Sequence, residues 1–171
     1  MGEFTSPEDE KFFGAIGRLT ISWSHLELGL DVGIYLIHRY LGGKDREKEL
    51  PRALSRKLKY FKRALEHLPV SEQNLPRYKS LITDIQNASD TRHDIIHGAV
   101  VSHEEGSGEA KLVRLIYKDS GWDTKPIDAS TVSILQAARD AEELATIVFQ
   151  IAQALAVVAH QSTKSGDEQT Q

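Results

Sequence analysis

The sequence of 171 residues contains no cysteine, and this absence removes several kinds of chemistry. Disulfide bonds, thiolate nucleophiles and zinc sites built on cysteine are all excluded. A chain without disulfides fits the reducing environment of the cytoplasm, which is where we expect this protein to act.

Long apolar runs are also missing. No stretch approaches the roughly 20 consecutive apolar residues that a membrane-spanning helix needs. The sequence starts with MGEFTSPEDE, which is acidic and lacks the basic and apolar regions of a signal peptide. We therefore expect no association with a membrane.

An excess of positive charge is absent as well, because the formal net charge is −4. A protein that coats nucleic acid is normally basic, so the total charge argues against that role. The cations are nevertheless unevenly spread. Four of them follow one another at steps of four, three and four residues, which places them on one side of a helix: Arg52, Arg56, Lys59 and Arg63. This basic stripe is either a solvated helix face or a surface that binds RNA phosphates.

Apolar residues recur at steps of three and four in four segments, which predicts four amphipathic helices. The expected helices cover residues 7–41, 51–68, 76–97 and about 130–160. Ser6 and Pro7 begin the first helix, and Asp128 or Ser130 caps the last one. We expect Gly98 to end the third helix as a glycine in the left-handed conformation.

The apolar period changes after Gly98. Val100-Val101 and residues 111–117 have the composition of strands, and the glycine-rich segment 104–109 joins them. This pattern predicts a β-hairpin at about residues 99–117. Residues 121–126 are expected to form a loop.

Short connections between the helices favour antiparallel packing. We therefore expect an all-α fold, namely an antiparallel four-helix bundle with the small β-hairpin inserted between its third and fourth helices. Residues 1–161 would form one domain, and the polar residues 162–171 a disordered tail. The first and last helices are longer than the middle two, so their apolar surface needs a partner. A twofold homodimer is the commonest solution.

The segment TRHDIIHG at residues 91–98 is the strongest candidate for chemistry, because it combines Arg92 with His93 and His97 at a helix end. Five residues of an ideal helix leave Arg92 and His97 about 140° apart around the axis. The two meet if the arginine reaches back, if His97 lies outside the regular turn, or if a twofold axis brings two copies together. The plain alternative is that these cations only complement the helix dipole.

An arginine and a histidine suit the cleavage of a phosphodiester in RNA, because RNA carries its own nucleophile, the 2′-hydroxyl. His97 would act as a general acid or base, and Arg92 would supply a fixed positive charge for the phosphate oxygens. His93 would orient or tune them. Asp94 would orient a histidine or pair with a basic residue. Glu27 shares a helix face with Trp23 and, if buried, needs a partner, for which Arg92 is the candidate.

A metal site is the competing use of the same residues. His93 and His97 are four residues apart, the spacing of paired ligands on one helix face. The further ligand would be Asp94, His103 or a residue from the other chain of a dimer. The sequence contains no second ligand motif, so we expect neither a metal nor a cofactor.

The stretch from Arg92 to His97 resembles the signature of the HEPN superfamily, which is an arginine, a polar residue, three to five variable residues and a histidine. The sequence WSHLE at residues 23–27 also resembles bacterial HEPN-like proteins, and the likeness covers about residues 7–160. The resemblance implies an all-α bundle that forms a dimer with both motifs at a shared cleft. It further implies a metal-independent endoribonuclease that acts as a toxin or in phage defence, with an antitoxin protein as a possible partner. Other members have lost catalysis and bind nucleotides or proteins, which is the alternative function here.

Overall fold

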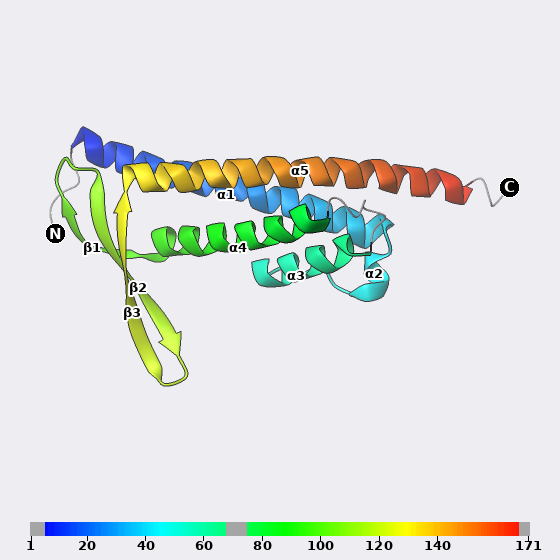
Figure 1. Cartoon of the computed structure of the whole chain (residues 1–171), viewed down its shortest axis with the longest axis horizontal. Helices are drawn as coiled ribbons and strands as arrows, with labels where there is room; N and C mark the ends of the chain where they lie inside the picture. Colours follow the sequence, from blue (N-terminus) through cyan, green and yellow to red (C-terminus); the bar gives the residue numbers. More distant parts are fainter. Residues whose placement is uncertain (1–5, 68–74, 168–171) are drawn as a thin grey trace. The chain divides into compact units, whose positions relative to one another are not determined.

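The computed structural model describes residues 6–67 and 75–167, as drawn in Figure 1. Within these residues the chain forms five helices and one three-stranded antiparallel sheet. The helices are α1 (Pro7–Tyr40), α2 (Gly43–Arg46), α3 (Leu54–Leu65), α4 (Leu75–His97) and α5 (Thr131–Asp167). The strands are β1 (Ala99–Glu104), β2 (Glu109–Lys118) and β3 (Gly121–Ser130), in the order β1-β2-β3.

The prediction of an all-α four-helix bundle is wrong, because the fold is mixed and contains a complete sheet. β1 and β2 form the predicted hairpin, but β3 occupies the segment that we expected to be a loop. It pairs with β2 from Glu109 opposite Ser130 to Lys118 opposite Gly121. The sequence does not indicate β3 as a strand, because Pro126 lies within this segment. An edge strand tolerates a proline, since one side of its backbone has no neighbouring strand to which it must donate.

The remaining boundaries follow local signals with small differences. α1 begins and ends close to the predicted residues, and α4 ends at His97 as predicted. α3 begins at Leu54 rather than at Pro51, and the predicted end of that helix at residue 68 lies outside the described residues. α5 continues to Asp167, into the segment expected to be a tail, whose last residues are also outside the described part.

The chain divides into two compact units. The first unit contains residues 1–24 and 86–142, and therefore the start of α1, the end of α4, the whole sheet and the start of α5. The second unit contains residues 25–85 and 143–171. The prediction that residues 1–161 form one domain stays a prediction.

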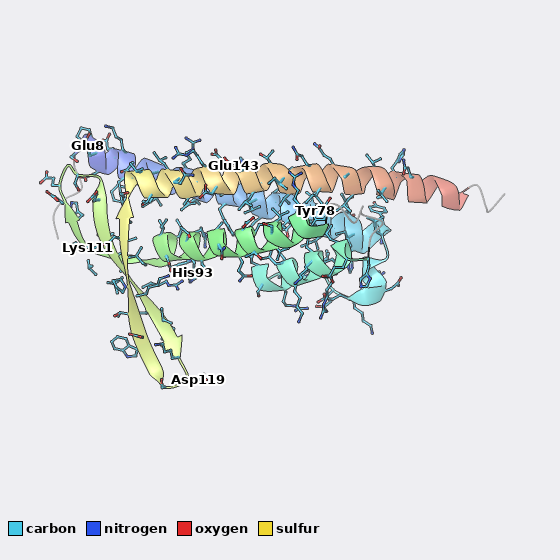
Figure 2. All side chains as sticks on the ribbon, viewed as in Figure 1. Glu8, Tyr78, His93, Lys111, Asp119 and Glu143 are labelled. Carbon is cyan, nitrogen blue, oxygen red and sulfur yellow. The ribbon has the colours of Figure 1, made fainter. Side chains whose placement is uncertain are left out.

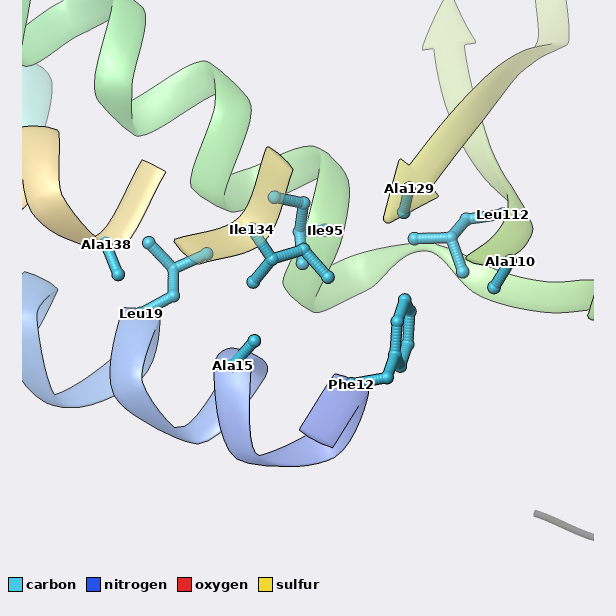
Figure 3. Packing of buried hydrophobic residues seen from close by; sticks show 9 residues of the cluster. All are labelled: Phe12, Ala15, Leu19, Ile95, Ala110, Leu112, Ala129, Ile134 and Ala138. Carbon is cyan, nitrogen blue, oxygen red and sulfur yellow. The ribbon is translucent and has the colours of Figure 1, made fainter. Parts of the chain in front are cut away.

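In the first unit, helices and sheet share one apolar core, which Figure 3 shows. Phe12 lies at the end of this cluster next to Leu112 and Ala110 of β2. The other buried members are Ala15 and Leu19 of α1, Ile95 of α4, Ala129 of β3, and Ile134 and Ala138 of α5. Burial of these side chains supplies the main driving force for docking the sheet on the helices.

Both helix starts in the first unit carry reciprocal side-chain caps. The backbone N–H of Asp9 donates to Ser6 Oγ, and that of Ser6 donates to the Asp9 carboxylate, each at 3.1 Å. At α5, the N–H of Ser133 donates to Ser130 Oγ at 3.1 Å, and the N–H of Ser130 donates to Ser133 Oγ at 2.9 Å. These bonds confirm Ser6 as the first cap and Ser130, rather than Asp128, as the last one.

An ion pair joins α1 to α5 inside the first unit. Arg18 Nε and Nη2 donate to the two carboxylate oxygens of Glu142, each at 3.1 Å. Ser22, which is buried, donates to the same carboxylate at 3.0 Å. The two donors lower the pKa of Glu142, with the Arg18 hydrogen bond as the larger cause.

Beyond Ala99, the first residue of β1, strands β2 and β3 continue as a two-stranded ribbon, which Figure 1 shows as a projecting hairpin. Tyr117 and Trp122 lie directly opposite each other on this ribbon, and they are 81% and 70% exposed. Trp23, by contrast, is 4% exposed and belongs to the core, as its place on the apolar helix face predicts.

The second unit packs the later part of α1 with α3 and the later part of α5. Gly33 of α1 lies against Phe61 of α3, where an added Cβ would come within 3.2 Å of the ring. Lys57 of α3 is 9% exposed and donates to Asp31 of α1 at 2.6 Å. The pairing explains how a lysine can be buried at this helix contact.

By length and composition, Thr131–Gln161 of α5 is apolar enough to cross a membrane. The core helix of a globular protein passes the same test, and 39% of the apolar window is buried inside the chain. A single helix of this kind is weak evidence for a membrane protein. The cytoplasmic location and the absence of membrane association stay predictions.

Candidate functional site

The residues of the predicted motif lie at the end of α4 that leads into β1, all within the first unit. Figure 2 shows His93 at this position, close to the strands. Asp94 is buried, Arg92 is half-buried, and His93 and His97 are exposed. A ligand in solution therefore has access to both imidazoles.

Arg92 and His97 meet within one chain. Arg92 Nη1 lies 3.4 Å from His97 Nε2. His97 is the last residue of α4, so the arginine bridges the angular offset with its length, and no second copy is needed for this contact. Because a guanidinium only donates, a hydrogen bond between these two atoms requires Nε2 of His97 as the acceptor. The homodimer stays a prediction, but the motif does not depend on it.

The second histidine lies beside the first, with 4.5 Å between the ring centroids of His93 and His97. Partial loss of hydration lowers the pKa of His93 below its usual value. Electrostatic interactions with Arg114, His97 and Arg92 act in the same direction, in that order, and only the Asp94 carboxylate opposes them. His93 is therefore held in its neutral form more strongly than a histidine in water.

Asp94 ties this helix end to the sheet. Arg114 Nη2 of β2 lies 3.2 Å from Asp94 Oδ1, and Lys125 Nζ of β3 donates to Asp94 Oδ2. Arg114 and Lys125 are directly opposite each other across the two strands, where two cations would repel without the carboxylate between them. Of the two roles considered for Asp94, pairing with basic residues is the one that the structure supports.

Sequence reasoning missed Arg114 and Lys125. Arg114 follows Leu112 by two residues, and alternation along a strand places both on the face that packs against the helices. A cation on a core-facing position is a signal for a buried partner. Lys125 gave no such signal, because its strand was not predicted.

The site carries an excess of positive charge. Arg92, Arg114 and Lys125 are three cations, and Asp94 is the carboxylate that pairs with two of them. The total negative charge of the chain therefore conceals a local positive field. An anion such as a phosphate fits this field, and a cation does not.

The other predicted site residues belong to the second unit. Glu27 is half-buried on α1, and its pairing with Arg92 stays a prediction. All four cations of the basic stripe are exposed, but Arg52 precedes the start of α3. Arg56 donates to Glu47 at 2.6 Å, so part of its charge is already compensated. The contact of the basic stripe with RNA stays a prediction.

Metal ligation receives no geometric support from the part of the chain that the structure describes. In residues 6–67 and 75–167, no group of three or more His, Asp or Glu side chains is placed to hold one metal ion. Asp94, one of the further ligands considered, already pairs with Arg114 and Lys125.

A cavity of about 460 Å³ lies in the first unit between the sheet and the start of α5. Its walls include Glu104 and Glu109, with Asp128 opposite Lys111. Three carboxylates and one lysine make this cavity acidic in balance. It is therefore a poorer place for a phosphate than the end of α4.

Comparisons with known proteins show no relative of this chain. No family model matches the sequence, and no curated protein or solved structure shows significant similarity. The resemblance to the HEPN signature therefore stays a prediction that depends on the residues from Arg92 to His97.

Proposed function

We propose that this protein is a metal-independent endoribonuclease, of the type that the HEPN-like motif implies, and that Arg92, His93 and His97 form its active site. The observation that supports the proposal is the 3.4 Å contact between Arg92 Nη1 and His97 Nε2 at an exposed helix end. A proton acceptor and a permanent positive charge lie within reach of one phosphodiester.

The chemistry uses the nucleophile of the substrate. The 2′-hydroxyl attacks the adjacent phosphorus, and its proton passes to His97 Nε2. Arg92 turns from the imidazole to the phosphate oxygens, whose negative charge grows in the transition state. The bond to the 5′-oxygen breaks, this oxygen takes a proton from water, and the products are a 2′,3′-cyclic phosphate and a 5′-hydroxyl.

The neighbouring residues support this assignment in different ways. The pKa of His93 is lowered, which favours its neutral form, so His93 places no competing positive charge beside His97. We assign His93 the role of orienting or tuning the His97 imidazole, beside which it lies. Asp94 is engaged by Arg114 and Lys125 and is therefore unavailable as the general base.

The direct test is incubation of the purified chain with RNA in the presence of EDTA. We expect cleavage by the native chain and a loss of about 100-fold or more in His97→Ala, the usual size of a general-base contribution. His67→Ala is the matched control, because His67 is an exposed histidine outside the motif. Equal activity of the native chain and His97→Ala would refute the proposal.

A role as a toxin or in phage defence is part of the same proposal and needs a test in cells. Expression in a bacterial host should arrest growth, and His97→Ala should relieve the arrest at equal protein level. A neighbouring gene whose product also relieves the arrest would identify the antitoxin. Growth that is unaffected by the native chain would remove the toxin role and leave the chemistry to the assay with purified protein.

The alternative function is a binding module without catalysis. The observation that favours it is the excess positive charge around Asp94, which suits an anionic ligand and does not require that His97 reacts. RNA that binds but stays intact, with equal affinity for the native chain and His97→Ala, would support this alternative.

A further inference from the structure

The sheet contributes cations to the end of α4, and they do not belong to the sequence motif. Arg114 is on β2 and Lys125 is on β3, and both are held by Asp94. Asp94 is 9% exposed, so its charge is directed at these two partners rather than at solvent. One carboxylate compensates one of the two charges, and the other positive charge remains in the site.

Arg114 is close enough to the motif to act on it. Its charge is the largest of the electrostatic influences that lower the pKa of His93, ahead of His97 and Arg92. His93 in turn lies beside His97. The contacts agree, because Arg114 pairs with Asp94, the residue that follows His93, and Arg92 lies 3.4 Å from His97, so these side chains gather at one helix end.

Two guanidinium groups of this region have donors that remain unused. The Nε atoms of Arg92 and Arg114 are buried, and neither has a hydrogen-bond partner among the described residues. Asp94 Oδ1, which lies 3.2 Å from Arg114 Nη2, is also a buried atom without a hydrogen-bond partner, so the Arg114–Asp94 ion pair leaves hydrogen-bonding capacity on both side chains. Buried donors in folded proteins are normally satisfied, so the two guanidinium groups have capacity for a further acceptor. Guanidinium groups bind phosphate through two parallel N–H donors, which matches donors of this kind.

We propose that Arg114 is a substrate-binding residue, which together with Arg92 forms an anion site for an RNA phosphate next to the reacting one, and that Asp94 is the positioning residue that holds Arg114 and Lys125 in place. The assignment of the anion to RNA rests on the proposed function. The anion site itself does not, because it requires no cleavage.

The sheet then has a function in substrate binding. β2 and β3 bring cations to a helix end where the motif alone supplies one arginine. Binding through a second phosphate also orients the chain of the RNA, which places the 2′-hydroxyl relative to His97. Loss of Arg114 should therefore raise KM more than it lowers kcat.

The test measures binding of an RNA oligonucleotide that carries 2′-O-methyl groups and cannot be cleaved, by fluorescence anisotropy over a range of salt concentrations. Arg114→Gln should weaken binding by about 10-fold. The slope of log affinity against log salt concentration should become smaller in magnitude by about 1, which corresponds to the loss of one phosphate contact. Arg114→Lys should restore part of the affinity, since it keeps the charge but loses the fork. Lys118→Gln is the matched control, because Lys118 is an exposed cation of the same strand that pairs with Asp123.

A second readout separates binding from folding and from catalysis. Titration of the histidines by NMR should show that inorganic phosphate raises the pKa of His93 in the native chain, because an anion offsets the surrounding cations. The same phosphate should have no effect in Arg114→Gln, at a temperature where melting shows the variant to be folded. If Arg114→Gln binds the oligonucleotide as the native chain does, or if phosphate shifts His93 equally in both, the proposal is wrong. Cleavage lost in His97→Ala with binding unchanged would leave the anion site standing.

Discussion

Gly98 follows His97 directly and is the residue where α4 passes into β1. It has no left-handed backbone, so the expected reason for a glycine at this position is wrong. Glycine is required here because the surrounding atoms leave no space for a Cβ. A Cβ added here would lie 2.7 Å from the carbonyl oxygen of Asp94 and 2.9 Å from the Cβ of Leu112. Neither atom is the flexible end of a side chain, so the strand itself must shift.

Gly98→Ala should therefore destabilise the first unit. Forcing one extra carbon into a packed region costs about 1–3 kcal/mol, and two contacts with rigid atoms place this case at about 2 kcal/mol or more. For a chain of this size that corresponds to a fall in Tm of about 4–8 °C. The displaced strand also carries the sheet away from α4, so the pairs of Asp94 with Arg114 and Lys125 should weaken.

Gly14→Ala is the matched control, because it makes the same chemical change with the opposite expected sign. Gly14 is inside α1, and an added Cβ would meet nothing within 4 Å. Removing glycine from a helix interior should stabilise the fold by about 0.5–1 kcal/mol. Thermal and urea unfolding measure both variants. A Gly98→Ala chain as stable as the native one would refute the packing argument.

Three further predictions concern charge. Asp94→Asn leaves Arg114 and Lys125 without their carboxylate, and should lower the free energy of unfolding in urea by about 3 kcal/mol; an unchanged value would mean that the pairs contribute nothing. The pKa of His93 is lowered from 6.5 by lost hydration and by interactions with Arg114, His97 and Arg92, and Asp94 opposes this shift only in part. The unfolded chain therefore binds a proton at His93 more tightly than the folded chain does. Stability should fall as the pH drops through 6.5, and urea unfolding of His93→Gln should show a smaller fall. The pKa of Glu142 is lowered from 4.5, so its contribution is present above that pH and is lost as the pH falls through the lower folded value. Acid unfolding of Glu142→Gln should therefore be less steep than that of the native chain.

The helices could be predicted because their signals are local. Ser6 and Pro7 at the start of α1, and the apolar steps of three and four along it, lie within a few residues of one another. β3 could not be predicted in the same way. Its stability comes from pairing with β2 and from the burial of Ala129, and neither is visible in a segment that contains Pro126 and mostly polar residues.

The candidate site divides along the same line. The sequence identifies Arg92 and His97 by their types and spacing, but their contact depends on the reach of the arginine side chain. Arg114 and Lys125 enter the site only through the register of two strands and a shared partner on α4. The reason for Gly98 is equally non-local, since it includes the position of Leu112 on β2.

The central claim is that His97 takes the proton of an RNA 2′-hydroxyl while Arg92 binds the phosphate. The most direct measurement is single-turnover cleavage, in EDTA, of one RNA and of the same RNA with a single 2′-deoxy residue before the cut. We predict a 2′,3′-cyclic phosphate from the RNA and no cut at the deoxy position. The rate should fall by about 100-fold or more in His97→Ala. Cleavage at the deoxy position, or an unchanged rate in His97→Ala, would contradict the account.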